Sequence, residues 1–114
     1  MRDPRQRLRD ILEAIQRIQR HARRGRAEFD KDELIQSWVV RHLELIGEAA
    51  GALPDDVRAL APGVPWKAVV GLRDLLGHRD FDVDTDLVWR VVEHDLPVLE
   101  PEVTNVLRTL EGGK

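Results

Sequence analysis

Apolar residues recur along this 114-residue chain at the three- and four-residue spacing that is typical of amphipathic helices. The first such stripe consists of Leu8, Ile11, Leu12, Ile15 and Ile18. No segment shows the sustained alternation of apolar and polar residues that predicts a strand, and no longer repeat is present. The spacing therefore predicts an all-α fold.

Glycines and capping residues set the expected limits of the first two helices. Residues 4 to about 24 form the first helix, and Gly25 is expected to stop it. After a short connection over 29–31, Asp30 is expected to cap a second helix, because Glu33 three residues later completes a capping-box spacing. This helix ends near residue 51 and carries small residues that permit close helix approach, namely Gly47, Ala49, Ala50 and Ala52.

The second half of the chain contains a short helix over about 54–60 and two longer helices. The first of these begins at Pro65 and ends at Gly77. The last covers about 85–110, with Asp84 as its expected cap. Because Pro97 and Pro101 fall inside it, a kink or break is expected near 96–101. The predicted architecture is an up-and-down bundle of four main helices plus a short one, in a single domain over 1–114.

Composition excludes several classes of protein. The chain has no cysteine, so disulfides and thiolate metal sites are excluded. We find no signal peptide and no apolar run of the roughly 20 residues that a membrane span needs, and we expect a cytoplasmic location. Residues 1–26 hold nine arginines against three acidic residues, whereas the remaining 88 residues hold nine Lys and Arg against eighteen Asp and Glu. This basic first helix is a phosphate-binding face, a solvated surface, or a surface that pairs with the acidic helices.

The segment over 71–81 holds the candidate chemistry, an arginine at Arg73 and a histidine at His78. RNA is cleaved without a metal when its 2′-hydroxyl attacks the adjacent phosphate, which requires proton transfer and positive charge on the phosphate. Histidine transfers protons near neutral pH, and arginine grips phosphate oxygens in two places. The plainer alternative is a surface arginine and a histidine that interacts with carbonyls at a helix end.

Helix geometry limits how these two side chains meet. Five residues on a straight helix leave Arg73 and His78 roughly 140° apart. They converge only if the helix ends or distorts between them, which Gly77 permits, or if two copies of the chain meet in a dimer. Asp74 lies four residues before His78, so it is placed to orient the imidazole and favour its protonated form.

The segment over 64–78, VPWKAVVGLRDLLGH, resembles the signature of the HepT-like HEPN proteins, the toxins of HepT–MntA toxin–antitoxin pairs. Three further segments fit in the same order: DILEAI at 10–15, RHLELIGEA at 41–49 and DLP at 95–97. The resemblance implies a HEPN helical bundle that forms a homodimer and brings two Arg-x4-His motifs into one cleft. It also implies a metal-independent endoribonuclease toxin without a cofactor, acting on RNA such as tRNA, with an MntA-like minimal nucleotidyltransferase as its antitoxin.

Carried over by position, Arg73 stabilises phosphate charge, His78 is the acid or base, and Asp74 occupies the place of a supporting polar residue. The chain departs from the family pattern two residues after the histidine. A tyrosine commonly stands there and is adenylylated by the antitoxin, but this chain has Asp80 and contains no tyrosine. Inhibition by tyrosine adenylylation at this site is therefore excluded.

Two hypotheses follow for Asp80. Either its permanent negative charge weakens RNA binding, with Arg79 offsetting part of that charge, or the protein stays active and is neutralised only by complex formation. Two alternatives to an active nuclease also remain. One is a catalytically silent HEPN subunit that helps a nucleotidyltransferase bind its substrate, and the other is a purely structural helical dimer.

Overall fold

The computed structural model describes residues 3–76 and 83–112, and for residues 74–76 it describes the backbone alone. This part of the chain is all-α and contains no strand, as predicted. Seven helical segments and one π-helical segment follow one another: α1 Pro4–Ala22, α2 Arg26–Lys31, α3 Glu33–Gly51, α4 Asp55–Arg58, α5 Trp66–Leu76, α6 Thr85–Arg90, η1 Val91–Asp95 and α7 Leu96–Leu110.

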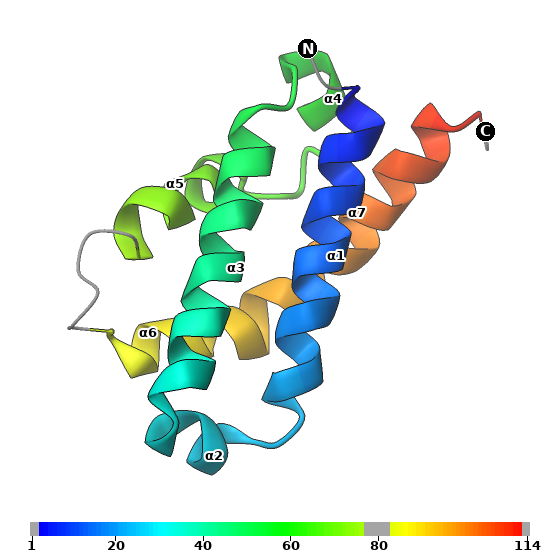
Figure 1. Cartoon of the computed structure of the whole chain (residues 1–114). Coiled ribbons are helices and arrows are strands. Elements are labelled where there is room, and N and C mark those ends of the chain that lie inside the picture. The colour runs from blue at the N-terminus through cyan, green and yellow to red at the C-terminus, as the bar shows by residue number, and fades with distance from the viewer. Residues whose placement is uncertain (1–2, 77–82, 113–114) are drawn as a thin grey trace.

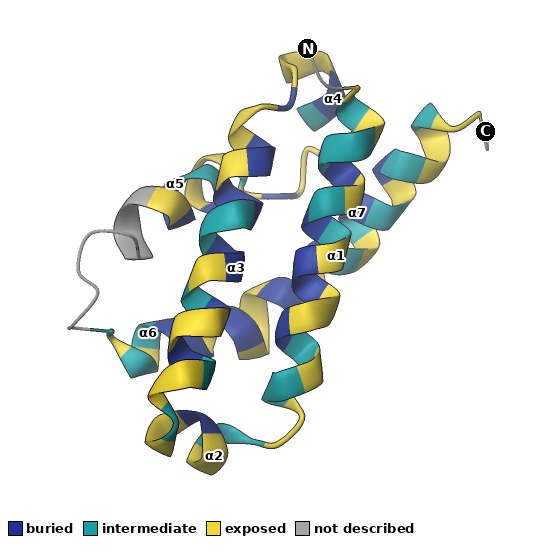
Figure 2. Cartoon of the chain, in the orientation of Figure 1, coloured by how far each residue is buried: buried dark blue, intermediate teal, exposed yellow. Residues whose placement is uncertain are grey.

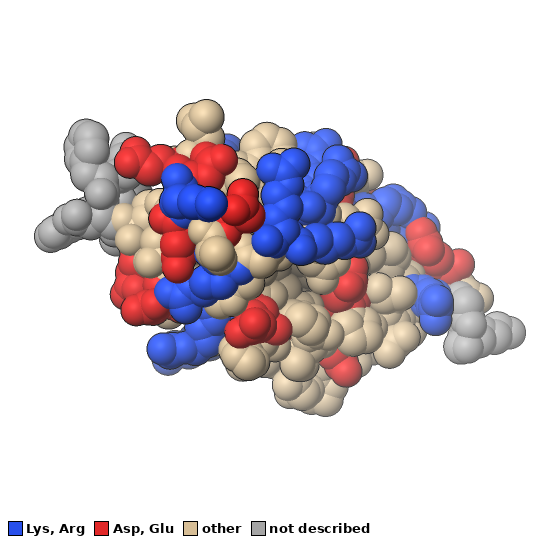
Figure 3. Space-filling view, turned by 90° about the horizontal axis from the view of Figure 1, so that it is seen from below, with Lys and Arg blue, Asp and Glu red and all other residues tan. Residues whose placement is uncertain are grey.

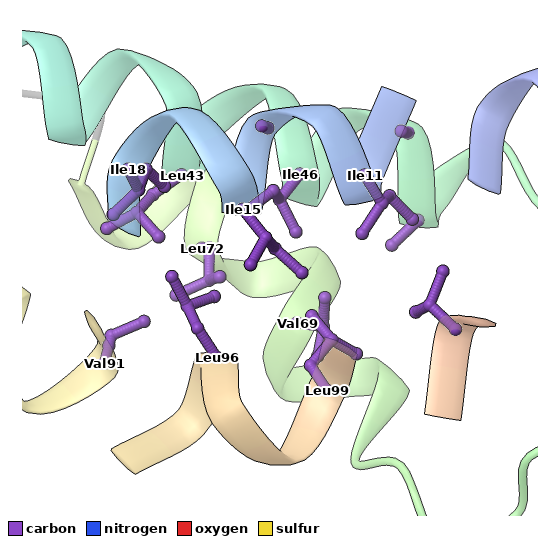
Figure 4. Packing of buried hydrophobic residues seen from close by; sticks show 14 of the residues in the cluster. Ile11, Ile15, Ile18, Leu43, Ile46, Val69, Leu72, Val91, Leu96 and Leu99 are labelled. Atoms are coloured by element: carbon purple, nitrogen blue, oxygen red, sulfur yellow. The ribbon is translucent and has the colours of Figure 1, made fainter. Parts of the chain in front are cut away.

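The long helices α1 and α3 lie side by side and run in opposite directions (Figure 1). Helix α5 packs on α3, and α7 packs on α1. The helices turn their buried faces inward (Figure 2). The resulting core joins isoleucines of α1 to Leu43 and Ile46 of α3, with Leu72 of α5 and Leu96 of α7 nearby (Figure 4). The predicted four-helix architecture is confirmed, with α6, η1 and α7 forming the last of the four.

The connection between the first two long helices differs from the prediction, because residues 26–31 form the helix α2. Gly25 has a φ of 90°, a conformation that glycine adopts freely, and it turns the chain so that α2 starts directly after it. The predicted cap is also wrong. Asp32, not Asp30, caps α3, and its carboxylate accepts hydrogen bonds from the backbone N–H groups of Leu34 at 3.0 Å and Ile35 at 3.2 Å.

The last helix begins as predicted, with the carboxylate of Asp84 accepting a hydrogen bond from the N–H of Leu87 at 3.1 Å. The expected irregularity exists, but it lies at Val91–Asp95, just before the predicted range of 96–101. These residues form a π-helical turn, and α7 then continues through Pro101 without a break. Pro97 has no N–H to donate to the carbonyl four residues earlier, which is consistent with a change of hydrogen-bond register there.

Within the described ranges, no helix is both long and apolar enough to cross a membrane. The same ranges contain no group of three or more His, Asp or Glu side chains placed to hold a metal ion.

Candidate functional site

Arg73 lies in the last turn of α5 and is exposed. The helix ends at Leu76 in the described part of the chain, next to the predicted stop at Gly77. Arg73 is thus presented to solvent on an ordered helix, close to the point where the candidate segment leaves that helix. Such a position suits a side chain that binds an external anion.

The start of α5 is fixed by Trp66. Its indole N–H lies 3.0 Å from the carbonyl oxygens of both Arg58 and Ala61 and donates a shared hydrogen bond to them. Further along, Val69 and Leu72 are buried in the core. The helix that carries Arg73 is therefore held at its first turn by hydrogen bonding and along its length by apolar burial.

Gly47 of α3 sets how closely the two helices approach at Arg73. A Cβ atom at Gly47 would lie 2.8 Å from the backbone nitrogen of Arg73 and 3.1 Å from the carbonyl oxygens of Val69 and Val70. Side chains essentially never approach backbone atoms so closely, so α5 keeps this position only while residue 47 is glycine. The sequence predicted close approach at these small residues, and the structure identifies α5 as the partner and Arg73 as a point of contact.

The described chain resumes at Val83 and continues into α6. Asp84 caps this helix, and Asp86 pairs with Arg26 of α2. The hydrogen bond that the Arg26 guanidinium donates to Asp86 is the main cause that raises the pKa of Arg26 above its usual value, with Asp30 adding to it. The helices on either side of residues 77–82, α5 and α6, are thus both tied to other elements of the fold.

Most of the predicted site residues lie outside the described residues. These are Gly77, His78, Arg79 and Asp80, and the side chain of Asp74 also lies outside them, although its backbone belongs to α5. The structure therefore places Arg73, and the convergence of Arg73 with His78 stays a prediction.

His42 of α3 is buried, with 5% of its surface exposed. Its Nδ1 lies 2.7 Å from the carbonyl oxygen of Trp38. Because a carbonyl only accepts, Nδ1 carries the proton and donates it. This hydrogen-bonded position agrees with a structural role for His42. The sequence analysis did not single out Trp38 itself, which is 40% exposed although large aromatic side chains are usually buried.

Comparisons with known proteins identify the family of the chain. The family model described as "Ribonuclease HepT-like" matches residues 11–106. A Methanocaldococcus jannaschii protein named "Putative RNase MJ1380" is 43% identical over 76 residues, which are 67% of this chain and 70% of that protein. A Thermococcus cleftensis protein named "Probable ribonuclease HepT" is 40% identical over 94 residues, covering 82% of this chain and 86% of that protein.

A third relative matches almost end to end. It is a Caldanaerobacter subterraneus subsp. tengcongensis protein named "Putative RNase TTE0752", 36% identical over 109 residues, which are 95% of this chain and 97% of that protein. No solved structure matches the chain significantly. The family model covers far more than half of the sequence, and the chain therefore belongs to the HepT-like ribonuclease family.

Proposed function

We propose that this protein is a metal-independent endoribonuclease whose reaction depends on Arg73 and His78. The observation that carries the proposal is the position of Arg73, exposed in the last turn of a helix that Gly47 holds in place, five residues before a histidine. Membership of the HepT-like ribonuclease family gives this pair its chemical context.

In the proposed reaction, the 2′-oxygen of the RNA attacks the adjacent phosphorus while the bond from phosphorus to the 5′-oxygen breaks. The 2′-hydroxyl loses a proton and the leaving 5′-oxygen gains one, so the products are a 2′,3′-cyclic phosphate and a 5′-hydroxyl. His78 transfers these protons, and in a dimer the two copies of His78 divide the roles of acid and base. Arg73 stabilises the charge that develops on the phosphate oxygens.

We also propose the setting that the sequence resemblance implies. In it, residues 1–114 form one HepT-like HEPN domain that works as a homodimer in the cytoplasm. The protein is the toxin of a toxin–antitoxin pair, cleaves RNA such as tRNA, and has an MntA-like minimal nucleotidyltransferase as its partner. Asp80 stands where an adenylylated tyrosine would be expected, so the partner acts here without tyrosine modification.

A cleavage assay in EDTA tests the reaction. The parent is incubated with total tRNA beside His78→Ala, and His94→Ala is the matched control, because His94 is exposed on η1. We expect His78→Ala to lose about 10²- to 10⁴-fold in rate, the range for a general acid or base, and His94→Ala to keep the parent rate. Equal rates for the parent and His78→Ala would contradict the proposal.

Arg73 is tested in the same assay. Arg73→Ala should lose about 10²- to 10³-fold, the usual loss when one group that stabilises transition-state charge is removed. Arg108→Ala, an exposed arginine on α7, is the control and should behave like the parent. A parent-like Arg73→Ala would remove Arg73 from the reaction.

A second candidate is a catalytically silent subunit that helps a nucleotidyltransferase bind its substrate. Asp80 favours it, because a carboxylate beside the cleft repels phosphate. The variant Asp80→Tyr distinguishes the two hypotheses for this residue, inhibition by its charge and no inhibition. If the permanent charge suppresses cleavage, the tyrosine variant is more active than the parent. If the variant is no more active, Asp80 is not an inhibitor, and a parent that cleaves nothing favours the silent subunit.

A further inference from the structure

Three aromatic rings form a row between α1 and α3. The ring centroids of His21 and Trp38 are 5.7 Å apart with an interplanar angle of 73°, and those of Trp38 and His42 are 4.3 Å apart with an angle of 39°. The hydrogen bond from His42 to the carbonyl of Trp38 holds the same turn of α3. The indole is thus supported by two imidazoles while 40% of the Trp38 surface stays exposed.

A hollow of about 400 Å³ opens beside this tryptophan. Its lining consists of one aromatic side chain among polar and charged ones, namely Glu13, Gln16, Arg17, Arg20 and Trp38. A lining of this kind differs from the apolar centre that a stable protein–protein interface needs. It resembles the combination of stacking ring and cations with which proteins bind single-stranded nucleic acid.

The arginines around the hollow differ in their pairing. Arg17 pairs with Glu13 at 3.0 Å, so its charge is locally compensated. Arg20, Arg23 and Arg24 form no ion pair with any described residue, and all three are exposed. Arg17 and Arg20 lie three residues apart on α1 and line the hollow with Trp38, and Arg23 and Arg24 form the turn that directly follows the last residue of α1, Ala22. Within the described chain, Arg20 thus leaves uncompensated positive charge beside Trp38, and Arg24 adds to it at the end of α1.

Figure 3 shows this end of the molecule from below, with Lys and Arg side chains gathered near the middle of the view and many acidic side chains to their left. Toward the N-terminal half of α1, the α1–α3 surface carries mixed charge. An adjoining hollow there shares Glu13 and Arg17 with the first and is also lined by Arg7, Asp10 and Glu48. The additional carboxylates of Asp10 and Glu48 disfavour a polyanion, so an anionic strand is best accommodated over the C-terminal half of α1.

We propose that Trp38, Arg20 and Arg24, called here the Trp38 surface, bind a single-stranded segment of the RNA substrate outside the catalytic residues. Trp38 stacks on one base, and the two arginines contact phosphates on either side of it. This inference rests on the proposed ribonuclease function and adds to it a substrate-binding subsite on α3, the C-terminal end of α1 and the turn that follows α1. Since every base has a stacking face, the subsite selects unpaired RNA rather than a particular sequence.

Binding to a fluorescein-labelled 12-nucleotide single-stranded RNA tests the proposal, measured by fluorescence anisotropy with full-length His78→Ala protein so that no cleavage occurs. Adding Trp38→Ala should weaken binding about 5- to 100-fold, the range for loss of one stacked base. Trp38→Phe keeps an aromatic ring and should lose less. Arg20→Gln and Arg24→Gln should each reduce the slope of log K against log salt by about 0.7, because one phosphate contact is lost.

Arg9→Gln is the matched control, because Arg9 also lies on α1 but pairs with Glu111 near the C-terminus. It should leave RNA binding unchanged. Circular dichroism checks that each variant is folded. If Trp38→Ala is not folded, the double variant Arg20→Gln/Arg24→Gln decides, since both side chains are exposed and without ion pairs in the described chain.

The proposal is overturned if the His78→Ala protein does not bind RNA, or if the folded variants bind RNA like the parent. It is also overturned if Trp38→Ala keeps RNA binding but loses self-association, measured by light scattering, because the surface then binds protein.

The experiments distinguish failure of the subsite from failure of the proposed nuclease function. RNA binding that depends on Trp38 in a protein that cleaves nothing supports the subsite and refutes the nuclease. Cleavage by the parent with unchanged binding in the variants refutes the subsite alone.

Discussion

The two sides of α3 make contacts of opposite kinds. Toward α5, Gly47 brings backbone against backbone, and there is no room for even one methyl group. Toward α1, the contact is made by large apolar side chains such as Ile15, Ile18 and Leu43, which are fully buried (Figure 4). The helix that carries Arg73 is therefore positioned by the shape of the backbone, whereas α1 is positioned by side-chain volume. Adding atoms should harm the first contact, and removing atoms should harm the second.

The largest effect is expected on the α1 side. Ile15→Ala removes a fully buried side chain and leaves a cavity between α1 and α3, so the free energy of unfolding should fall by about 2–5 kcal/mol. Urea denaturation followed by circular dichroism measures it. Val98→Ala, where the side chain is 60% exposed, should change it by less than about 0.5 kcal/mol. Similar losses in both variants would mean that volume does not position α1.

Gly47→Ala tests the α5 side. The added methyl group meets the backbone at Arg73, so the free energy of unfolding should fall by about 1–3 kcal/mol, as for an overpacked contact. On the proposed function, the RNA cleavage rate should also fall by up to about 10²-fold, because the shift displaces Arg73. Urea denaturation and the tRNA assay measure the two effects.

Two other glycines provide controls for this variant. A Cβ at Gly71 would meet nothing within 4 Å, and one at Gly51 would make an ordinary contact of 3.4 Å with a side-chain carbon of Val70. Gly71→Ala should stabilise α5 by about 0.5–1 kcal/mol, because alanine is the better helix former. If Gly47→Ala is as stable as Gly71→Ala, the close approach does not constrain α5.

A smaller effect is expected at the N-terminus of α3, the helix that makes both the contact with α1 and the contact with α5. Asp32→Ala removes the side chain that caps two backbone N–H groups and should cost about 1 kcal/mol. Asp30→Ala removes only an exposed pair with Arg26 and should cost no more than about 0.5 kcal/mol. Thermal unfolding of both variants measures the difference. A larger loss of stability in Asp30→Ala than in Asp32→Ala would mean that Asp30 is the cap.

The smallest effect concerns the exposed start of α1. The carboxylate of Asp3 accepts hydrogen bonds from the side chain and the backbone N–H of Arg5, and these lower the pKa of Asp3 from 3.8 to about 2. A lowered pKa means that Asp3 stabilises the folded state above about pH 4 and that this contribution is lost as the pH falls toward 2. NMR titration of the carboxyl group measures the pKa. A value near 3.8 would mean that the pair does not form in solution.

The sequence predicted most of the helices because apolar spacing is a local signal. It placed α1 within two residues of its observed end and identified Asp84 as a cap. It missed α2, because the reason for that helix lies elsewhere in the chain. Phe29 of α2 is buried against Trp89 of α6, with ring centroids 5.4 Å apart. A contact across sixty residues leaves no mark in local spacing.

The candidate site divides in the same way. Its predicted chemistry, the arginine and histidine pair, rests on residue identity and order, and the aspartate in place of a tyrosine rests on the resemblance to the family. The structural support of the site does not follow from the sequence. That Gly47 faces Arg73, and that Trp38 is exposed beside arginines without ion pairs in the described ranges, depends on how the helices pack together. Periodicity states which face of a helix is apolar, but only the packed structure states what that face meets, because helix partners are chosen by shape and volume summed over the whole core.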